Sequence, residues 1–211
     1  MNQVDRQLTR LIKSYQSAIS IIRLLVESQG VALEGESITN RLPGFMLDMN
    51  AFFRAILSRF LRENLPGYNV LDKHSRKGMM RYNPNFSPPR NSPTPRPDYV
   101  IKQGSKICSI FDAKYRDIWE KDLPRHMLCQ LVVYAVSHRD QPRSTILYPT
   151  FHLGARETRI EVMDPLYGKR IGPVRMCPVN LELLETLVND FTSQGRRRRE
   201  EYAFRLAQHG G

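Results

Sequence analysis

Apolar side chains recur at helical spacing in four parts of the chain. Gly30 ends the first of these runs, and Asp48 precedes the second, where its carboxylate suits a helix N-cap. Pro124 places the true start of the third run near itself, because proline fits a first helical turn and not an interior. We therefore predict helices within residues 4–29, 49–63, 117–139 and 181–191, the last of them closing the fold.

Alternating apolar and polar positions predict strands between these helices. Residues 99–102 and 106–115 flank a turn at residues 103–105 and predict an antiparallel hairpin. Residues 78–97 hold six prolines, so we expect a loop there. Shorter runs predict further strands at residues 70–71, 145–148, 159–163 and 172–176. This mixture predicts an α/β (mixed α+β) domain in which helices flank a central sheet.

The length of 211 residues fits one domain with irregular additions. We divide the chain into an N-terminal helical segment, residues 1–45, a core, residues 46–195, and a basic C-terminal tail, residues 196–211. The longest apolar stretches are too short to cross a membrane, and the polar N-terminus lacks the apolar run of a secretory signal. We therefore expect a cytoplasmic protein with no membrane association.

The formal net charge of +11 favours a polyanionic partner, because each cation set against a phosphate releases a condensed counterion. Nucleic acid is the first candidate, and an anionic membrane surface and an acidic protein are the alternatives. The three cysteines, Cys108, Cys129 and Cys177, contain no CxxC pair. Neither a disulfide framework nor a zinc site is therefore expected.

Two acids and a lysine on the predicted hairpin carry the candidate chemistry. Asp98 opens the first strand and Asp112 lies on the second, so strand pairing would bring the two carboxylates side by side. Lys114 is two residues from Asp112 and therefore points to the same face. Magnesium prefers one or two carboxylates together with water and phosphate oxygens, which suits phosphodiester hydrolysis. The alternative is a solvated ion pair on an ordinary strand.

In the hydrolytic interpretation, Lys114 orients the attacking water or stabilises the negative charge that develops on the phosphate. The side chain of Ala113 points into the core, while its backbone carbonyl is a candidate third metal ligand. These roles predict that loss of the lysine side chain abolishes turnover and leaves folding nearly intact.

Several ordered motifs resemble one group of enzymes. They are Arg96-Pro97-Asp98, then Asp112-Ala113-Lys114-Tyr115, then Gln130 with Tyr134-Ala135, and then Tyr148-Pro149. This order resembles the PD-(D/E)xK nuclease superfamily and, more narrowly, the McrC family of modified-cytosine restriction systems. The segments Leu42–Phe45 and Asp48–Asn50, with Phe53, extend the similarity over most of residues 5–190.

The resemblance implies a restriction-endonuclease-like central mixed β-sheet and an endonuclease that cuts double-stranded DNA with Mg²⁺, for which Mn²⁺ can substitute. Asp98 and Asp112 would hold the metal, and Lys114 and Gln130 would serve catalysis, with Gln130 near the phosphate or the water. Side chains expected to contact DNA are Arg96, Arg116, Lys121, Arg125 and Tyr134. The alternatives are ordinary helix surface for Gln130, a core position for Tyr134 and solvated charges for the basic residues.

Two departures from the family pattern leave alternatives open. Arg54 stands where the family often has an acid, which predicts a weaker second metal site unless Asp48 or Glu63 compensates. Fuller relatives carry an N-terminal region that engages a GTP-hydrolysing motor, whereas we expect this chain to begin at or near the nuclease portion. A McrB-like motor partner is therefore an expectation of the resemblance alone. A homodimer, a non-cleaving DNA-binding or assembly subunit, and an RNA-directed nuclease also stay open.

Overall fold

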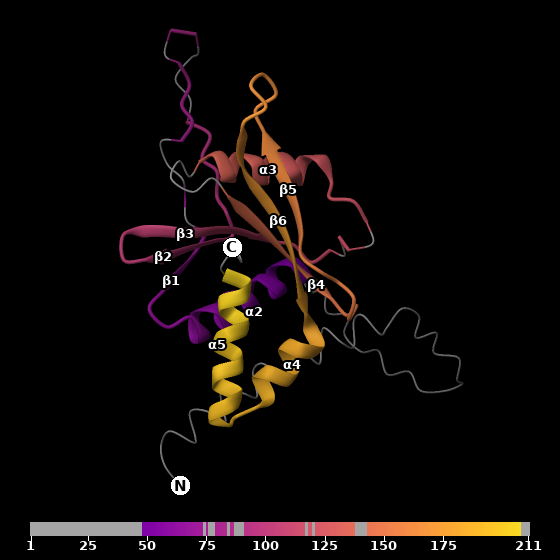
Figure 1. Ribbon diagram of the computed structural model, residues 1–211. Coiled ribbons are helices and arrows are strands. Elements are labelled where there is room, and N and C mark those ends of the chain that lie inside the picture. Colours follow the sequence, from indigo (N-terminus) through magenta and orange to yellow (C-terminus); the bar gives the residue numbers. More distant parts are fainter. Residues whose placement is uncertain are drawn as a thin grey trace, which may run out of the picture.

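The fold is a β-sheet covered by helices on both faces (Figure 1). The computed structural model describes residues 48–73, 75, 79–83, 85–86, 91–116, 118–119, 121–137 and 143–207. The helix predicted within residues 4–29 and the motif at residues 42–45 lie outside this part of the chain.

The central sheet is mixed and has six strands in the order β1-β2-β3-β4-β6-β5. The strands are β1 (Asn69–Asp72), β2 (Tyr99–Gln103), β3 (Lys106–Ala113), β4 (Ser144–Thr150), β5 (Thr158–Met163) and β6 (Arg170–Asn180). β4 runs parallel to both β3 and β6, and the other neighbouring pairs are antiparallel. Every predicted strand is present, which confirms the α/β fold class.

The sheet separates two apolar cores, each of which is covered by one or more helices. They are α2 (Met49–Asn64), α3 (Arg125–Val136), α4 (Leu181–Asn189) and α5 (Ser193–Ala207). α3 covers one face of the sheet, where Leu131 and Tyr134 share a core with Ile110. α2, α4 and α5 cover the other face around Phe111 (Figure 1). Alternation along β3 thus sends neighbouring side chains to opposite cores. Among the described helices, none has the length and apolarity needed to cross a membrane.

α2 begins and ends close to the predicted positions. Asp48 Oδ1 accepts a hydrogen bond from the backbone N–H of Ala51 at 3.0 Å, which confirms the N-cap. The helix ends at Asn64, and Gly67 follows with φ +80°, a backbone conformation that favours glycine. These two ends fix a helix whose buried side lies against the sheet, with Phe53 and Phe60 fully buried.

The β2–β3 hairpin confirms the predicted antiparallel pair. Tyr99 lies opposite Phe111 in its register, so continuing the register by one residue sets Asp98 opposite Asp112. Gly104 in the turn has φ +58°, again a conformation that favours glycine. β3 ends at Ala113, two residues earlier than predicted. The hairpin therefore delivers both acids to one end of the strand pair.

Residues 196–207 form most of α5, so the predicted basic tail is wrong for this segment. Tyr202 and Leu206 lie one helical turn apart and are buried, as is Ala203 between them. These side chains share the core of α2 and α4. The four arginines at residues 196–199 dominate the local composition, whereas burial of the apolar face stabilises the helix.

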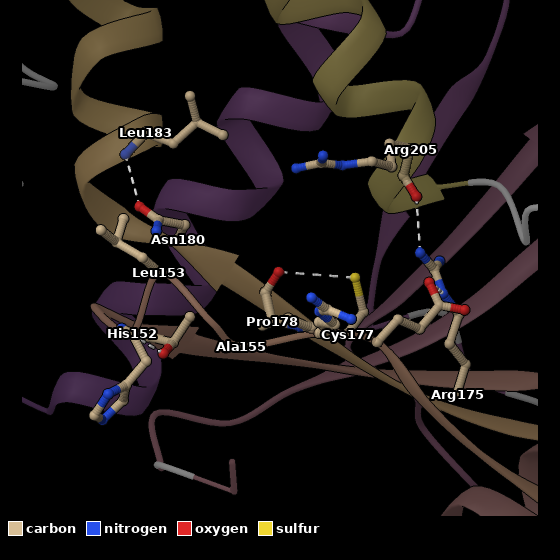
Figure 2. A pocket seen from close by; sticks show the side chains of 12 residues that line it. His152, Leu153, Ala155, Arg175, Cys177, Pro178, Asn180, Leu183 and Arg205 are labelled. Atoms are coloured by element: carbon tan, nitrogen blue, oxygen red, sulfur yellow. Dashed lines mark hydrogen bonds and ion pairs between the residues drawn. The ribbon is translucent and has the colours of Figure 1, made fainter.

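Arg175 on β6 holds the C-terminal end of α5 (Figure 2). The residue is 1% exposed, and its guanidinium donates to the backbone oxygens of Leu206 at 3.0 Å and Arg205 at 2.9 Å. It also forms an ion pair with Glu157. Carbonyls at a helix C-terminus lack partners within the helix and carry partial negative charge, so a buried cation suits them.

We predict that Arg175→Met lowers the free energy of unfolding by about 2–4 kcal/mol, because it leaves the carbonyls of Arg205 and Leu206 without their donor and Glu157 with Arg159 as its remaining cation partner. Urea denaturation measures the loss. Arg170→Met is the matched control, since Arg170 pairs with Glu161 on the surface, where such pairs contribute at most about 1 kcal/mol. Equal losses in the two variants would show that Arg175 does not anchor α5.

Candidate active site

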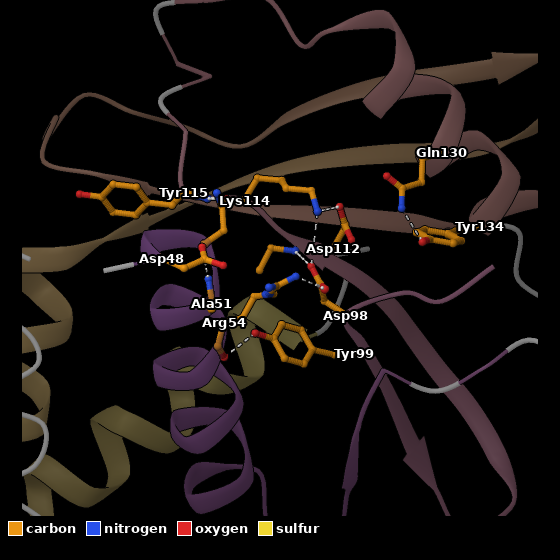
Figure 3. A network of polar contacts seen from close by, with 12 residues as sticks. Asp48, Ala51, Arg54, Asp98, Tyr99, Asp112, Lys114, Tyr115, Gln130 and Tyr134 are labelled. Atoms are coloured by element: carbon orange, nitrogen blue, oxygen red, sulfur yellow. Dashed lines mark hydrogen bonds and ion pairs between the residues drawn. The ribbon is translucent and has the colours of Figure 1, made fainter. Parts of the chain in front are cut away.

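Asp98 and Asp112 lie side by side, as the hairpin predicted (Figure 3). Asp98 comes directly before β2, and its Oδ2 accepts a hydrogen bond from the backbone N–H of Ala113 on β3 at 2.9 Å. The two residues are only 7% and 2% exposed. Buried carboxylates need partners, because an unpaired buried charge is costly. The groups around Asp98 and Asp112 therefore determine how the two charges are stabilised.

Lys114 supplies one partner. Its Nζ lies 2.9 Å from Asp112 Oδ2 and 3.8 Å from Asp98 Oδ2. Its backbone N–H donates to the oxygen of Leu147 on β4 at 3.0 Å, which continues the pairing of β3 with β4 beyond the last strand residue. The ammonium is thus held beside both carboxylates, on the face of β3 that the two-residue spacing predicted.

Arg54 on α2 supplies a second cation, which sequence reasoning noted only as a missing acid. Its Nη1 donates to Asp98 Oδ1 at 3.2 Å (Figure 3). Asp48 caps α2, and Glu63 forms an ion pair with Arg59, so both acids that could have replaced the missing carboxylate have partners within or at the start of the helix. No local signal could have revealed the contact, because Arg54 and Asp98 are 44 residues apart.

Two further hydrogen bonds fix α2 against the hairpin. Tyr99 Oη donates to the backbone oxygen of Arg54 at 2.5 Å. The backbone N–H of Tyr115 donates to Asn50 Oδ1 at 2.9 Å. The helix is therefore attached to the residue after Asp98 and to the residue after Lys114, which sets the position of Arg54. Asn50 belongs to the motif Asp48-Met49-Asn50, but its sequence context did not indicate this role.

Burial raises the pKa of Asp112 from its ordinary 3.8 to about 7. The negative charge of Asp98 adds to this rise, and the ammonium of Lys114 opposes it. Two carboxylates close together in a buried site cannot both ionise without help from a cation. The site therefore favours binding of further positive charge near Asp112.

Gln130 and Tyr134 lie on α3, to the right of Asp112 in Figure 3, and the charge of Asp112 acts on Tyr134. Gln130 Nε2 donates to Tyr134 Oη at 2.6 Å. Burial raises the pKa of Tyr134 to about 12, with smaller contributions from the charges of Asp112 and Asp98. Tyr134 is 1% exposed, so its burial argues against the predicted contact with DNA and makes it a support for Gln130.

The other predicted DNA-contacting residues are basic and exposed. Arg96 comes two residues before Asp98, and Arg116 two residues after Lys114. Lys121 and Arg125 lie just before and at the start of α3. These side chains are free to meet a polyanion at the surface around the site, and their contact with DNA stays a prediction.

The donor set fits magnesium better than a metal held by protein ligands alone. Within the described part of the chain, no group of three or more histidine, cysteine or acidic residues is arranged to hold a metal ion. Magnesium commonly keeps several waters and takes only one or two carboxylates, which Asp98 and Asp112 can provide. Cys108, Cys129 and Cys177 are free cysteines.

Two pockets lie near these elements. One of about 220 Å³ is next to Arg54 and Asp98 and is also lined by Ser58, Asp72 and Lys73. The other, of about 400 Å³, is lined by residues of β6 and the segment after β4, including Arg175 (Figure 2). Of these two pockets in the described part of the chain, the smaller one contains Asp98.

A mixed sheet between helices, with two acids and a lysine at the end of its hairpin, is consistent with the restriction-endonuclease-like fold of the PD-(D/E)xK nuclease superfamily. Residues 2–149 match the model of a family described as McrBC 5-methylcytosine restriction system component. The chain belongs to this family, which confirms the resemblance seen in the motifs.

Among solved structures, the chain is similar to one from Thermococcus gammatolerans, described as a refined half-complex from a tetradecameric assembly of McrB AAA+ hexamers with bound McrC. The identity is 23%, the TM-score is 0.48, and the match covers 75% of this chain. It covers 34% of the other chain, so this chain spans about a third of that length. No curated protein matches.

We predict that Asp112→Asn stabilises the fold in the presence of chelator, and that the gain depends on pH. Between pH 4 and 7 the folded wild type binds more protons at Asp112 than the unfolded chain, so its stability falls as pH rises through that window. Asparagine does not titrate. The variant should therefore match the wild type near pH 4 and melt at a higher temperature at pH 8.

Thermal denaturation at both pH values measures this difference, at about 2–4 °C for each kcal/mol in a domain of this size. Glu182→Gln is the control, because it removes an exposed carboxylate on α4. A melting temperature of Asp112→Asn that stays at or below that of the wild type at pH 8 would contradict the unfavourable burial of this charge.

Proposed function

We propose that the chain is a metal-dependent DNA endonuclease of a restriction system, which hydrolyses phosphodiester bonds. One observation carries this proposal: the Lys114 ammonium lies within 3.8 Å of both buried carboxylates, Asp98 and Asp112. Buried acids with perturbed pKa values next to a cation are typical of functional sites. Membership of the McrBC family supports the same reaction.

Asp98 and Asp112 would hold Mg²⁺ or, in its place, Mn²⁺, with the backbone carbonyl of Ala113 as a further ligand. Such an ion would polarise the phosphate and lower the pKa of the attacking water. The positions of the two carboxylates are set by the hairpin before any ligand arrives, because the backbone of Ala113 already holds Asp98. A preorganised site of this kind avoids the cost of ordering its groups during the reaction.

Lys114 would orient the attacking water and stabilise negative charge on the phosphate, because its ammonium is a compact cation with three donors. Gln130, which Tyr134 holds through a hydrogen bond, would face the phosphate or the water from α3. The exposed cations Arg96, Arg116, Lys121 and Arg125 would contact DNA phosphates and make binding sensitive to salt.

The proposed substrate is double-stranded DNA, with modified cytosine as a preferred feature because of the description of the family. A McrB-like, GTP-hydrolysing motor is the proposed partner on the same ground. Cleavage of both strands by a chain with one site would use two copies or sequential nicking, so a homodimer on DNA is part of the proposal. Because an RNA-directed nuclease is an alternative, the cleavage of single-stranded RNA is compared with that of duplex DNA.

The ion pair of Arg54 with Asp98 favours a second candidate, a DNA-binding or assembly subunit that does not cut. In that case Arg54 and Lys114 would neutralise the two acids permanently. The two candidates differ in whether DNA is cleaved when a divalent metal is supplied.

We predict that the full chain nicks supercoiled plasmid in Mg²⁺ or Mn²⁺ and that chelator stops the reaction. Asp112→Ala and Lys114→Ala should each lower the rate at least about 10²-fold, because they remove a metal ligand and a charge-stabilising group. Gel electrophoresis of modified and unmodified plasmid, with and without a McrB-like motor, measures the rates. Glu182→Ala, which removes an exposed acid on α4, is the control.

Intact plasmid in all of these conditions, together with retained DNA binding, would reject cleavage and favour the second candidate. Faster cleavage of RNA than of duplex DNA would reject the proposed substrate. Equal activity of Asp112→Ala and the wild type would reject the site.

A further inference from the structure

Asp98 has partners on both of its oxygens before any metal is considered. Oδ1 accepts from Arg54 Nη1 at 3.2 Å, while Oδ2 accepts from the backbone of Ala113 at 2.9 Å and lies 3.8 Å from Lys114 Nζ. The backbone bond belongs to the hairpin and is hard to give up. Arg54 is therefore the partner that a metal ion would have to replace at Oδ1.

When both carboxylates are ionised, the charges of the site sum to zero without a metal. Asp98 and Asp112 face the cations Lys114 and Arg54. A divalent ion on the two carboxylates would leave a surplus of positive charge, and the guanidinium would then be repelled from Asp98. A DNA phosphate supplies the negative charge that restores the balance, and a guanidinium matches phosphate geometry through paired donors.

Arg54 has room to leave Asp98 without disturbing its helix. Its backbone oxygen is held by Tyr99 Oη, whereas its side chain is 29% exposed and borders the pocket of about 220 Å³. Lys73 lines the same pocket and donates its backbone N–H to the backbone oxygen of Asp98 at 2.9 Å. Arg54 on α2 and Lys73, which follows β1, therefore border a space beside Asp98. Asp72 in the same lining is paired with Arg62.

We propose that Arg54 competes with the divalent metal for Asp98 and, once the metal is bound, binds a DNA phosphate oxygen in the pocket that it shares with Lys73. This inference rests on the proposed function, because it assigns a role at the same site. It makes the arginine a positioning residue that couples metal binding to DNA binding.

The first test is Mn²⁺ binding to the full chain without DNA, measured by isothermal titration calorimetry. Arg54→Ala should bind Mn²⁺ about twofold to fivefold more tightly than the wild type, because a partly exposed competing ion pair is lost. Arg54→Glu should bind still more tightly, since it adds a carboxylate. Arg59→Ala is the matched control on the same helix, because Arg59 forms an ion pair with Glu63 and should leave the affinity unchanged.

The second test is binding to duplex DNA over a range of salt concentrations, with Ca²⁺ and with chelator. In Ca²⁺, Arg54→Ala should lower the slope of log K against log salt by about one, which corresponds to one lost phosphate contact. In chelator the slope should not change, because Asp98 then holds the arginine. Arg59→Ala should keep the wild-type slope in both conditions.

Unchanged or weaker Mn²⁺ affinity of Arg54→Ala would overturn the competition, and an unchanged salt slope in Ca²⁺ would overturn the phosphate contact. Arg54→Gln replaces Arg54→Ala if circular dichroism shows that the alanine variant does not fold. Neither test measures cleavage. A chain that shows both effects and leaves plasmid intact would therefore refute the proposed endonuclease and support the role of Arg54.

Discussion

The hydrogen bond from the backbone of Ala113 to Asp98 Oδ2 is the contact on which the site depends. It joins the end of β3 to the residue before β2, so the carboxylate acts as the last partner in the pairing of the hairpin. A buried backbone N–H needs an acceptor, and Asp98 satisfies it at 2.9 Å. The same bond sets Asp98 beside Asp112, which directly precedes Ala113 on β3. This one hydrogen bond therefore both extends the strand pairing and places the two carboxylates next to each other.

Two buried acids need positive charge nearby, and other elements of the fold provide it. Lys114 comes from the end of β3 and Arg54 comes from α2, which Tyr99 and Asn50 attach to the hairpin. α3 closes the other side with Gln130 and Tyr134. Three elements therefore converge on the buried carboxylate pair, where burial raises the pKa of Asp112. Active sites commonly trade stability for function in this way.

Local sequence patterns predicted the six strands, the helices α2, α3 and α4, and the core of the site. The Asp48 cap, the hairpin and the two-residue spacing of Asp112 and Lys114 all follow from interactions between residues close in the chain. The contact of Arg54 with Asp98 and the anchoring of α5 by Arg175 join residues that are 30 or more positions apart, and no local pattern encodes them. The α5 helix was missed because its arginines outweighed an apolar face of few residues.

The central claim is that Asp98 and Asp112 together hold the divalent ion. A crystal structure of the full chain with Mn²⁺, with data collected at the manganese absorption edge, tests it most directly, because anomalous scattering locates the ion independently of activity. The account predicts a peak about 2.1 Å from an oxygen of each carboxylate, close to the distance typical of Mg²⁺ sites. A manganese peak away from these carboxylates would contradict it, if Arg54 is still paired with Asp98 and Lys114 with both acids.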